Sequence, residues 1–446
     1  MGGEWPVKTL GELTVWSSGG TPSKQNPGYW GGDIPWISAV SMKTLHLEDS
    51  PLKITPEGLE HGSRLADSGS VLLLVRGSEL HKRVPIGITK RPLAFNQDVK
   101  CLTPEEGLLP EYLFYWLLGN RPVLLNKVEQ TGIGAGKLDT DVVKRLPFSL
   151  PPLPEQRAIA RILSALDDKI ELNRRMNETL EAMARALFKS WFVDFDPVRA
   201  KMEGRDSGLP KHIAGLFPDR LVESELGEIP EGWETGVLGG FFEIGLGGAW
   251  GNDRESSRAS LAVRCLRGID CHNLAEGRIP DVPVRWLSLG QARDRRLSDG
   301  VILVEGSGSF CGRSLLWDSS YSRLFDEPTV YSNFCKRLDP LCTYSQAAVC
   351  WMQMRRAYRD GELQAFRTGT AFPNLDVHGL LANLPVVVPP DPVATTYLRL
   401  LEPYRRVGLM MQSRTLGALR DTLLPKLISG ELRVDDPDRF LEEVVA

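Results

Sequence analysis

One segment of the sequence looks able to bind a phosphate group. Residues Gly132 to Lys137 form a glycine-rich run that ends in lysine, like a loop whose backbone N–H groups cradle phosphates. The pattern is incomplete, because Thr131 stands where the first glycine is required and Leu138 stands where serine or threonine should be. The segment is therefore not expected to bind a nucleotide.

Two further groups of residues could suggest a metal ion or a nucleophile. Cys265, Cys271 and His272 are candidate metal ligands, but no second pair at ligand spacing accompanies them. The run from Gly306 to Ser309 lacks the residue order of a nucleophile elbow. The six histidines are scattered and offer no catalytic triad. We therefore predict a non-catalytic chain without catalytic, cofactor-binding or metal-binding residues.

One alternative function is enzymatic. The loop Asn26-Pro27-Gly28-Tyr29 resembles the Asn-Pro-Pro-Tyr loop with which amino methyltransferases hold a target base. Glycine replaces the second proline here, and no glycine-rich nucleotide fingerprint precedes the loop, so an ordinary Asx-Pro turn is favoured. A stand-alone N6-adenine DNA methyltransferase stays the alternative, and binding of S-adenosylmethionine by the isolated chain would discriminate it.

The sequence repeats itself at an offset of more than half its length. Thr131 to Asp139 returns as Thr368 to Asp376, and each copy is followed by Leu-Pro and then Pro-Pro. Further blocks recur in the same order: Trp5 with Trp233, Val71–Val75 and Gly77-Ser78 with Val301–Val304 and Gly306-Ser307, and Asn96 with Asn333. So long a repeat indicates a duplicated domain rather than a solenoid. Two diverged copies suit recognition of two related but different targets.

Composition places the chain among globular proteins. Its 446 residues suffice for two domains, and 42% hydrophobic and 25% charged residues are ordinary for a soluble protein. The N-terminus does not resemble a signal peptide and no apolar run approaches ~18 residues, so we expect a cytoplasmic protein without membrane contact. Seven cysteines without a C-x-x-C pair are expected to be free thiols. A net charge of −4 neither indicates nor excludes nucleic-acid binding.

Proline clusters and changes of periodicity divide the chain. A first α/β domain is expected at 1–150, with strands at 71–75 and 148–150 and a helix at 110–118. Prolines 151, 152 and 154 then precede a helix that begins near Glu155. The remaining predicted boundaries are a central helix within 151–200, a linker at 201–224, a second domain at 225–388, a C-terminal helix within 389–430 that Pro403 kinks or restarts, and a tail at 431–446.

Apolar residues in both long helices recur at steps of three and four, as in a coiled coil. The predicted seam residues are Leu163, Leu166, Ile170, Asn173, Asn177, Leu180 and Leu187 in the first helix and Leu401, Met411, Leu416, Leu419 and Leu423 in the second. Asparagines in a seam typically fix its register. We predict an α+β fold with two duplicated α/β domains separated by two long helices that form an antiparallel coiled coil. The alternative is an amphipathic helix packed on its own domain.

Polar and cationic loop residues in both copies suit contacts with DNA. The first copy supplies hydroxyl and backbone N–H groups for phosphate, and the second is rich in arginine, whose fork can take both acceptors of a guanine edge. The predicted DNA contacts are Ser18, Thr21, Ser23, Lys24, Arg76, Lys82, Arg83, Lys137, Arg254, Arg258, Arg264, Arg267, Ser307 and Arg313. Arg267 and Arg313 are the favoured base readers, and ordinary surface arginine is the alternative for any one of them.

Four blocks of the sequence carry a family resemblance. Residues 28–40, together with the preceding Gly-Gly-Thr-Pro-Ser, resemble the first target-recognition domain of a type I restriction–modification specificity subunit. Residues 150–157 resemble the start of that family's central helix, 186–197 its end, and 423–432 the end of its C-terminal helix. The second copy departs most, because residues 246–251 replace the Gly-Gly-Thr-Pro-Ser loop.

The resemblance implies a function in a complex. Each target-recognition domain would read one half of a split, asymmetric site in double-stranded DNA, and the paired helices would fix the gap between the halves. Two methylation subunits that use S-adenosylmethionine, and restriction subunits that use ATP and Mg²⁺, would assemble on a chain that itself binds no cofactor. A third interpretation is a pure assembly scaffold, for which DNA footprinting would show no sequence preference.

Overall fold

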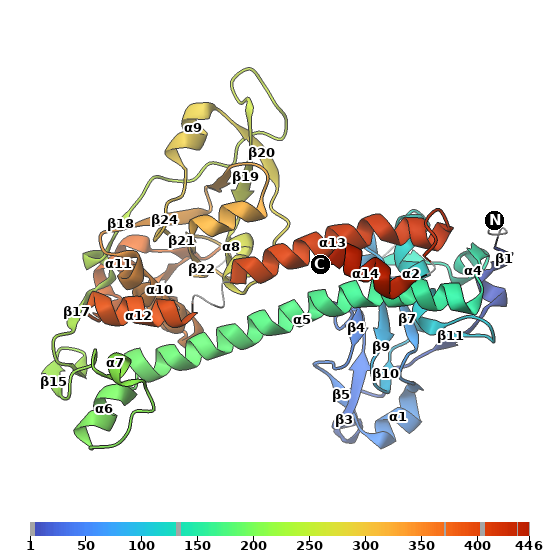
Figure 1. The fold of residues 1–446 in the computed structure, drawn as a ribbon, viewed down its shortest axis with the longest axis horizontal. Helices are drawn as coiled ribbons and strands as arrows, with labels where there is room; N and C mark the ends of the chain where they lie inside the picture. The colour runs from blue at the N-terminus through green and yellow to red at the C-terminus, as the bar shows by residue number, and fades with distance from the viewer. Residues whose placement is uncertain (1–4, 131–134, 370–371, 402–405, 435, 446) are drawn as a thin grey trace. The chain divides into compact units, whose positions relative to one another are not determined.

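A computed structural model describes residues 5–130, 135–369, 372–401, 406–434 and 436–445 (Figure 1). The chain divides into two compact units, Met1–Asp168 with Leu416–Ala446, and Lys169–Thr415. Each unit contains one copy of the repeat and part of both long helices. The first half of the phosphate-loop look-alike, residues 131–134, and Pro403 lie outside the described residues.

Helix α5 runs without interruption from Leu153 to Phe192 (Figure 1). It begins two residues before the predicted Glu155, because Pro154 is tolerated in a first turn, where the backbone N–H has no partner within the helix. Five predicted seam residues are buried, namely Leu163, Leu166, Asn173, Asn177 and Leu180. Ile170 and Leu187 are half-buried.

The predicted C-terminal helix consists of two helices, α12 at Asp391–Leu401 and α13 at Arg406–Ser429. Leu416 is buried as predicted, whereas Leu401, Met411, Leu419 and Leu423 are half-buried. The fully covered apolar positions of α13 are Val407, Met410, Leu424 and Leu427. At two places the buried residue of α13 is therefore the neighbour of the predicted seam residue: Met410 is buried instead of Met411, and Leu424 instead of Leu423.

Helices α5 and α13 pack together in antiparallel directions. In the first unit, Arg420 Nη1 lies 2.6 Å from Asp167 Oδ1. In the second unit, Asn173 Nδ2 donates to Gln412 Oε1 at 3.0 Å and to Ser413 Oγ at 3.3 Å. The residue numbers increase along α5 from Asp167 to Asn173 while those of their partners on α13 decrease from Arg420 to Gln412. The two helices are therefore antiparallel, which confirms the predicted coiled-coil pairing.

The first unit builds its core around a five-stranded sheet in the order β2-β11-β7-β9-β4. Helix α2 (Pro110–Gly119) packs on this sheet, and its apolar residues 112–118 are buried. Strands of the first unit include β1 (Val7–Thr9), β2 (Thr14–Ser18), β3 (Trp30–Ile37), β4 (His46–Leu47), β7 (Val71–Leu74), β8 (Arg76–Gly77), β9 (Ile86–Thr89), β10 (Leu93–Phe95), β11 (Val99–Pro104), β12 (Val128–Gln130), β13 (Gly136–Leu138) and β14 (Pro147–Ser149). The strands at 71–75 and 148–150 and the helix at 110–118 are confirmed within one residue at each end.

The second unit has a four-stranded sheet in the order β18-β24-β21-β22, beside which lies helix α10 (Tyr344–Asp360). A second sheet has the order β20-β19-β23. The strand bounds are β17 (Glu234–Val237), β18 (Phe242–Ile244), β19 (Leu261–Leu266), β20 (Val284–Leu287), β21 (Ile302–Glu305), β22 (Ser314–Leu316), β23 (Thr329–Tyr331), β24 (Cys335–Pro340), β25 (Arg367–Thr368), β26 (Asn374–Leu375) and β27 (Pro385–Val388).

The two units share one backbone framework. Strand β3 runs parallel to β10 as β19 runs parallel to β23, and the β1–β14 pair corresponds to β17–β27. Gly19 and Gly248 are equivalent, because the next residues donate to equivalent carbonyl groups, Gly20 N to Phe95 O at 2.9 Å and Ala249 N to Tyr331 O at 3.0 Å. A Cβ atom on either glycine would clash with a backbone oxygen, at 2.0 Å from Phe95 O and 2.1 Å from Ser332 O. The loop at 246–251 therefore keeps the backbone path of the first copy although its sequence departs from it.

Backbone hydrogen bonds correct two of the predicted pairings between the copies. Leu138 N donates to Val75 O at 2.8 Å, and Leu375 N donates to Gly306 O at 2.9 Å, so Val75 corresponds to Gly306 and Arg76 to Ser307. Asn96 N donates to Ile37 O as Ser332 N donates to Leu266 O, so Asn96 corresponds to Ser332 and Gln97 to Asn333. The predicted correspondences of Gly77-Ser78 with Gly306-Ser307 and of Asn96 with Asn333 were therefore wrong, because they rested on identical residues and not on strand pairing.

Segments predicted to lack regular structure contain some. The predicted linker at 201–224 includes the end of α6 (Asp196–Met202), helix α7 (Lys211–Ala214) and strand β15 (Leu221–Ser224), with Ile213 and Phe217 buried against Trp191 of α5. The predicted tail at 431–446 includes helix α14 (Pro437–Val445), from which Phe440 and Leu441 pack on the first core. Apolar side chains in these segments find neighbouring cores to cover them.

Candidate nucleic-acid interface

The first unit has a cleft of about 500 Å³ where β2 ends, β11 begins and β8 pairs with β13. We call it the first cleft; its lining residues are Ser18, Val75, Arg76, Gln97, Asp98, Lys100, Lys137, Leu138, Asp139, Thr140 and Asp141. Three residues predicted to contact DNA, Ser18, Arg76 and Lys137, therefore meet in one place.

Arg76 and Lys137 face each other directly across β8 and β13. Side chains in such a register have Cβ atoms about 4.5–5.5 Å apart, and like charges placed this way destabilise a sheet. Neither residue has a carboxylate partner within 4 Å among the described residues. The sheet thus keeps two unneutralised cations at the cleft, as a site for a negatively charged or electron-rich ligand requires.

Lys100 contributes a third cation to the first cleft. Its Nζ donates to Ser18 Oγ at 2.6 Å. Burial first, and then the nearby charge of Arg76, lowers the pKa of Lys100 below its ordinary value. A bound anion would relieve that repulsion, so the lysine is placed where a phosphate or base acceptor stabilises it.

The acidic residues around the first cleft are engaged within the protein. Asp98 accepts from Asn96 Nδ2 at 3.1 Å, and Asp139 caps helix α4 (Thr140–Lys144) by accepting from Asp141 N at 2.8 Å. Asp141 in turn lies 3.4 Å from Lys144 Nζ. The carboxylates therefore accept hydrogen bonds within the protein, and the charge of Asp98 also acts on Lys100, whose pKa it raises against the larger opposing effect of burial.

The second unit has a cleft of about 690 Å³ at the equivalent place. We call it the second cleft; it is lined by Trp250, Arg267, Gly268, Ile269, Glu305, Gly306, Ser307, Gly308, Asn333, Phe334, Lys336, Phe372 and Asn374. Ser307 and Asn374 form a β-bridge where the first unit pairs Arg76 with Lys137. Two phenylalanines stand open to solvent, Phe334 at 58% and Phe372 at 81% exposure.

The backbone framework makes six lining positions of the two clefts equivalent. They are Val75 and Gly306, Arg76 and Ser307, Gln97 and Asn333, Asp98 and Phe334, Lys100 and Lys336, and Lys137 and Asn374. A lysine and a side-chain amide recur in both clefts. The other four positions differ in charge, size or hydrogen-bonding capacity. The two copies thus have a cleft at the same position of the fold, with different side chains lining it.

Two predicted arginines of the second unit are bound within the protein. Arg264 Nε lies 2.7 Å from Glu327 Oε2, and its Nη1 donates to Val282 O at 2.9 Å. Arg267 lines the second cleft, but its guanidinium grips Asp270 at 2.8 and 3.0 Å. Arg264 therefore fixes the position of strand β19. Only some of the guanidinium N–H donors of Arg267 remain available to a ligand, because Asp270 accepts from Nε and Nη2.

The remaining predicted arginines of the second unit lie outside the second cleft. Arg313 stacks on Phe310, with its Cζ 3.8 Å from the ring centroid, and lines a separate cavity of about 70 Å³. That cavity also contains His272, whose pKa is lowered by burial and then by the charge of Arg313. Arg254 and Arg258 are exposed in the segment that precedes β19.

The other predicted residues of the first unit, Thr21, Ser23, Lys24, Lys82 and Arg83, do not line the first cleft. Thr21 donates to Gln97 Oε1 at 2.7 Å, and Ser23 Oγ accepts from Gln25 N at 3.3 Å. Arg83 Nη2 donates to Met42 O at 3.0 Å, which ties this arginine to its own loop. Lys24 and Lys82 are exposed.

Several residues that line the clefts were not predicted from the sequence, namely Gln97, Lys100, Asn333, Phe334, Lys336, Phe372 and Asn374. A signal for the lysine pair existed. Aligning Pro104 with Pro340, at the ends of β11 and β24, matches Lys100 with Lys336, whereas aligning the two Asn residues shifts the strand by one position.

The enzymatic features singled out from the sequence have structural explanations. Asn26 Oδ1 accepts from Gly28 N at 3.0 Å, which is the expected Asx-Pro turn, and Tyr29 stacks on His61. All seven cysteines are free thiols, and the described part of the chain contains no cluster of metal-ligating side chains. No helix among the described residues is long and apolar enough to cross a membrane.

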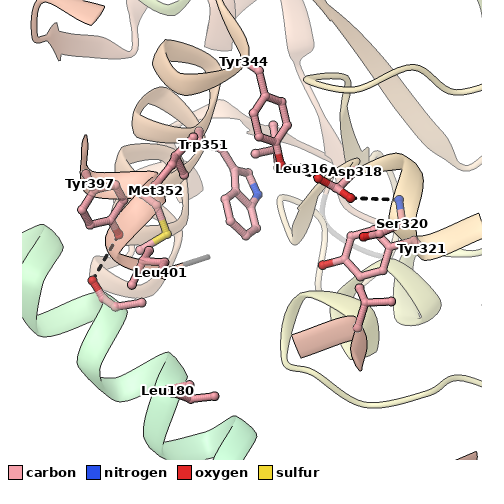
Figure 2. A pocket seen from close by; sticks show the side chains of 14 residues that line it. Leu180, Leu316, Asp318, Ser320, Tyr321, Tyr344, Trp351, Met352, Tyr397 and Leu401 are labelled. Atoms are coloured by element: carbon pink, nitrogen blue, oxygen red, sulfur yellow. Dashed lines mark hydrogen bonds between the residues drawn. The ribbon is translucent and has the colours of Figure 1, made fainter. Parts of the chain in front are cut away.

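A third cavity, of about 180 Å³, lies in the second unit between α5, α10 and α12 and is mainly apolar (Figure 2). Leu180, Trp351 and Met352 line it, and Tyr397 donates to Ala184 O at 3.1 Å. The carboxylate of Asp318 accepts from Ser320 N and from Tyr344 OH. This arrangement has no pair of free titratable groups and is a gap in helix packing.

Comparisons with known proteins agree on one family. A family model described as "Type I restriction modification DNA specificity domain" matches residues 2–182. The chain is 27% identical to the type I restriction enzyme MjaIX specificity subunit of Methanocaldococcus jannaschii, over 97% of this chain and 94% of that protein. It is 34% identical to the EcoR124I/EcoR124II specificity subunit of Escherichia coli, over 37% of this chain and 41% of that protein.

A solved structure has the same fold. The S subunit of a type I restriction–modification system from M. genitalium aligns over 95% of this chain and 96% of its own, with a TM-score of 0.51 and 15% sequence identity. The chain is therefore similar to type I restriction–modification specificity subunits, through the domain matched at residues 2–182 and along nearly its whole length. A stand-alone methyltransferase is not supported.

Proposed function

We propose that this specificity subunit reads a split, asymmetric site in double-stranded DNA, one half with each copy of the repeat. The copies correspond to residues 1–150 and 225–388. The observation that carries the proposal is the pair of equivalent clefts, which share a lysine and an amide and differ at neighbouring positions. Contacts with phosphate carry no sequence information, whereas side chains that reach base edges distinguish the bases.

The paired helices provide the scaffold for partners. Helix α5 exposes three apolar side chains on one face, Leu172 at 49%, Met176 at 42% and Met183 at 51%. Their spacing of four and seven residues places them along one stripe of the helix. Such a stripe, together with its flanking charges, suits a protein partner. We assign it to a methylation subunit, and the complete assembly to two methylation subunits and the restriction subunits.

The chemistry of the assembly resides in those partners. The methylation subunits bind S-adenosylmethionine, and the restriction subunits use ATP and Mg²⁺. Calorimetric titration of the isolated chain with S-adenosylmethionine is expected to give no heat of binding, whereas the assembled methyltransferase binds it. Binding by the isolated chain would contradict this division of labour.

Methylome sequencing tests the proposal as a whole. A host that carries the intact system is expected to show N6-methyladenine in a two-part motif with an unspecified gap, and deletion of this chain is expected to abolish that motif. Retention of the motif after deletion would mean that another subunit reads the DNA. Methylation without any sequence preference would favour a pure scaffold.

A further inference from the structure

The two clefts differ at the residues that decide which base edge can bind. The shared Lys100 and Lys336 present the same charge in both units and cannot distinguish the half-sites. The three differing polar or aromatic positions are Arg76 and Ser307, Asp98 and Phe334, and Lys137 and Asn374. The first cleft therefore presents the donors of Arg76 and Lys137 beside the carboxylate of Asp98, and the second presents an amide, a hydroxyl and exposed aromatic carbon.

We propose that the first cleft reads a guanine and that the second cleft reads an A·T pair through the thymine methyl group. This assignment rests on the proposed function, in which each unit reads one half of a DNA site. It adds which base pair each cleft selects and which side chains make the selection.

The first cleft matches the major-groove edge of guanine. Guanine presents two acceptors there, O6 and N7, and the guanidinium fork of arginine can donate to both. Arg76 is exposed, and no carboxylate among the described residues occupies it. Lys137, directly opposite on β13, adds donors to the same acceptors, while Lys100 is held by Ser18 at the side of the cleft. The cytosine edge offers only the N4–H donor, and the adenine edge offers the N7 acceptor beside an N6–H donor, so neither presents a pair of acceptors to the arginine fork.

The second cleft matches the major-groove edge of an A·T pair. The side-chain amide of asparagine can accept from adenine N6 and donate to N7, and an aromatic ring can cover the thymine methyl group. Asn374 supplies such an amide where the first cleft has Lys137, Phe334 stands where the first cleft has Asp98, and Phe372 also lines the second cleft. Phe334 and Phe372 are exposed in a protein that buries most of its large apolar side chains, which indicates surfaces reserved for a ligand.

The charged residues of the second cleft do not make it a guanine site. Arg267 is bound to Asp270 and also donates to Asp281 O at 2.8 Å. The carboxylate of Glu305 lies in the floor, where its Oε2 is buried without a partner among the described residues. Lys336 packs over Gly306, since a Cβ on that glycine would lie 2.8 Å from Lys336 Cγ. Lys336 remains the counterpart of Lys100 as a phosphate contact.

The first experiment uses altered bases in the DNA bound by the assembled methyltransferase. Once methylome sequencing gives the site, each guanine is replaced in turn by 7-deazaguanine, which lacks the N7 acceptor, and each thymine by uracil, which lacks the methyl group. The thymine paired with the methylated adenine is left unchanged. We expect one 7-deazaguanine in the first half-site to weaken binding roughly five- to tenfold. One uracil in the second half-site is expected to weaken it about fourfold.

The second experiment imports the residues of one cleft into the other. The double variant Arg76→Ser, Lys137→Asn is expected to lose its preference for G·C at one position of the first half-site and to keep the second half-site unchanged. Its control is Lys90→Asn, Arg91→Ser, which makes the same charge change at exposed positions outside the cleft. The control should weaken all sequences alike, if it weakens any.

Phenylalanine variants test the second cleft. Phe334→Ala and Phe372→Ala should weaken binding to thymine-containing DNA and remove the sensitivity to uracil. Phe310→Ala is the matched control, because Phe310 is 53% exposed in the same unit but lies under Arg313 and outside the cleft. These side chains are exposed, so the variants are expected to fold normally.

Three outcomes would overturn the assignment. One is a first half-site that contains no G·C pair. The second is equal sensitivity to uracil in the wild type and the Phe334→Ala and Phe372→Ala variants. The third is a cleft variant that weakens every sequence equally, as its charge control does. A complex that binds DNA without sequence preference would instead contradict the proposed function itself.

Discussion

Arg420 on α13 forms an ion pair with Asp167 on α5, 253 residues earlier, with Nη1 and Oδ1 2.6 Å apart. Tyr115 of helix α2 donates to the other carboxylate oxygen at 3.0 Å. The Asp167 side chain is only 3% exposed, so the pair is sealed inside the first unit. One carboxylate thereby joins the α/β domain to both long helices.

Removing the Asp167 carboxylate should strongly destabilise the folded protein. Asp167→Ala leaves Arg420 and the Tyr115 hydroxyl without their shared buried partner, and is expected to lower the free energy of unfolding by roughly 3–5 kcal/mol. Urea unfolding of the full chain measures it. Asp168→Ala, at the exposed neighbouring residue, is the control and should cost much less. Equal effects of the two substitutions would mean that the ion pair is not important for stability.

Arg264→Ala should affect stability and leave base preference intact. The substitution removes the ion pair with Glu327 and the hydrogen bond to Val282 O, both half-buried, at a cost of roughly 1–3 kcal/mol. Thermal unfolding measures the loss, and competition binding against single-base variants of the site measures preference. A change of preference at one position, without loss of stability, would instead make Arg264 a base reader.

Exchange of the second reading module should change one half-site alone. The structure places suitable boundaries at residues 239–383, because Leu238 N donates to Leu384 O and β17 pairs with β27 outside them. Replacing that segment with its equivalent from a diverged relative keeps this strand pair and Trp233 native. Methylome sequencing should show one new half-site and one unchanged. Simultaneous change of both halves would contradict independent reading.

The length of the paired helices should set the gap between the half-sites. Four residues inserted after Asp168 and four after Thr415, where both helices pass from one unit to the other, would lengthen each by ~6 Å. That is near two base pairs of DNA rise at ~3.4 Å each. The methylated motif should keep both halves and widen its gap.

The site of this insertion matters. An insertion after Glu178 would separate Asn177, which donates to Gly277 O, from Glu181, which pairs with Arg355, and so would disturb packing within the second unit. The same insertion after Asp206, an exposed residue outside the long helices, is the control. An unchanged gap after the paired insertion would rule out the helices as a ruler.

Glu305 should make stability fall as pH rises. Burial raises the pKa of this carboxyl, against the smaller opposing effect of Arg313. Because the folded state holds the proton more tightly, the stabilisation is fully present below the ordinary glutamate pKa and is lost as pH rises through the raised pKa. Glu305→Gln should remove this slope and stabilise the chain by roughly 0.5–2 kcal/mol at pH 8. The free energy of unfolding measured at several pH values tests whether stability falls as pH rises. Glu243→Gln, at an exposed position, is the control.

The sequence by itself determined the plan of the molecule. The repeat of Thr131–Asp139 as Thr368–Asp376 indicated two copies of one domain, and the three- and four-residue steps from Leu163 to Leu187 indicated a long paired helix. These signals are local, because a helix face and a proline boundary depend on nearby residues. The four blocks that resemble specificity subunits indicated the function in the same way, because short runs of residues can be recognised without any tertiary contact.

Tertiary structure alone decided which residues share a site. Ser18, Arg76, Lys100 and Lys137 come from four different strands or strand ends, and only the sheet pairing brings them to one cleft. The register of a strand cannot be fixed from matched residues alone, so the alignment of Asn96 with Asn333 concealed the pairing of Lys100 with Lys336. The sequence also could not distinguish Arg264, which pairs with Glu327, from Arg76, which has no carboxylate partner among the described residues. Charge partners are set by contacts between residues that are distant in the sequence.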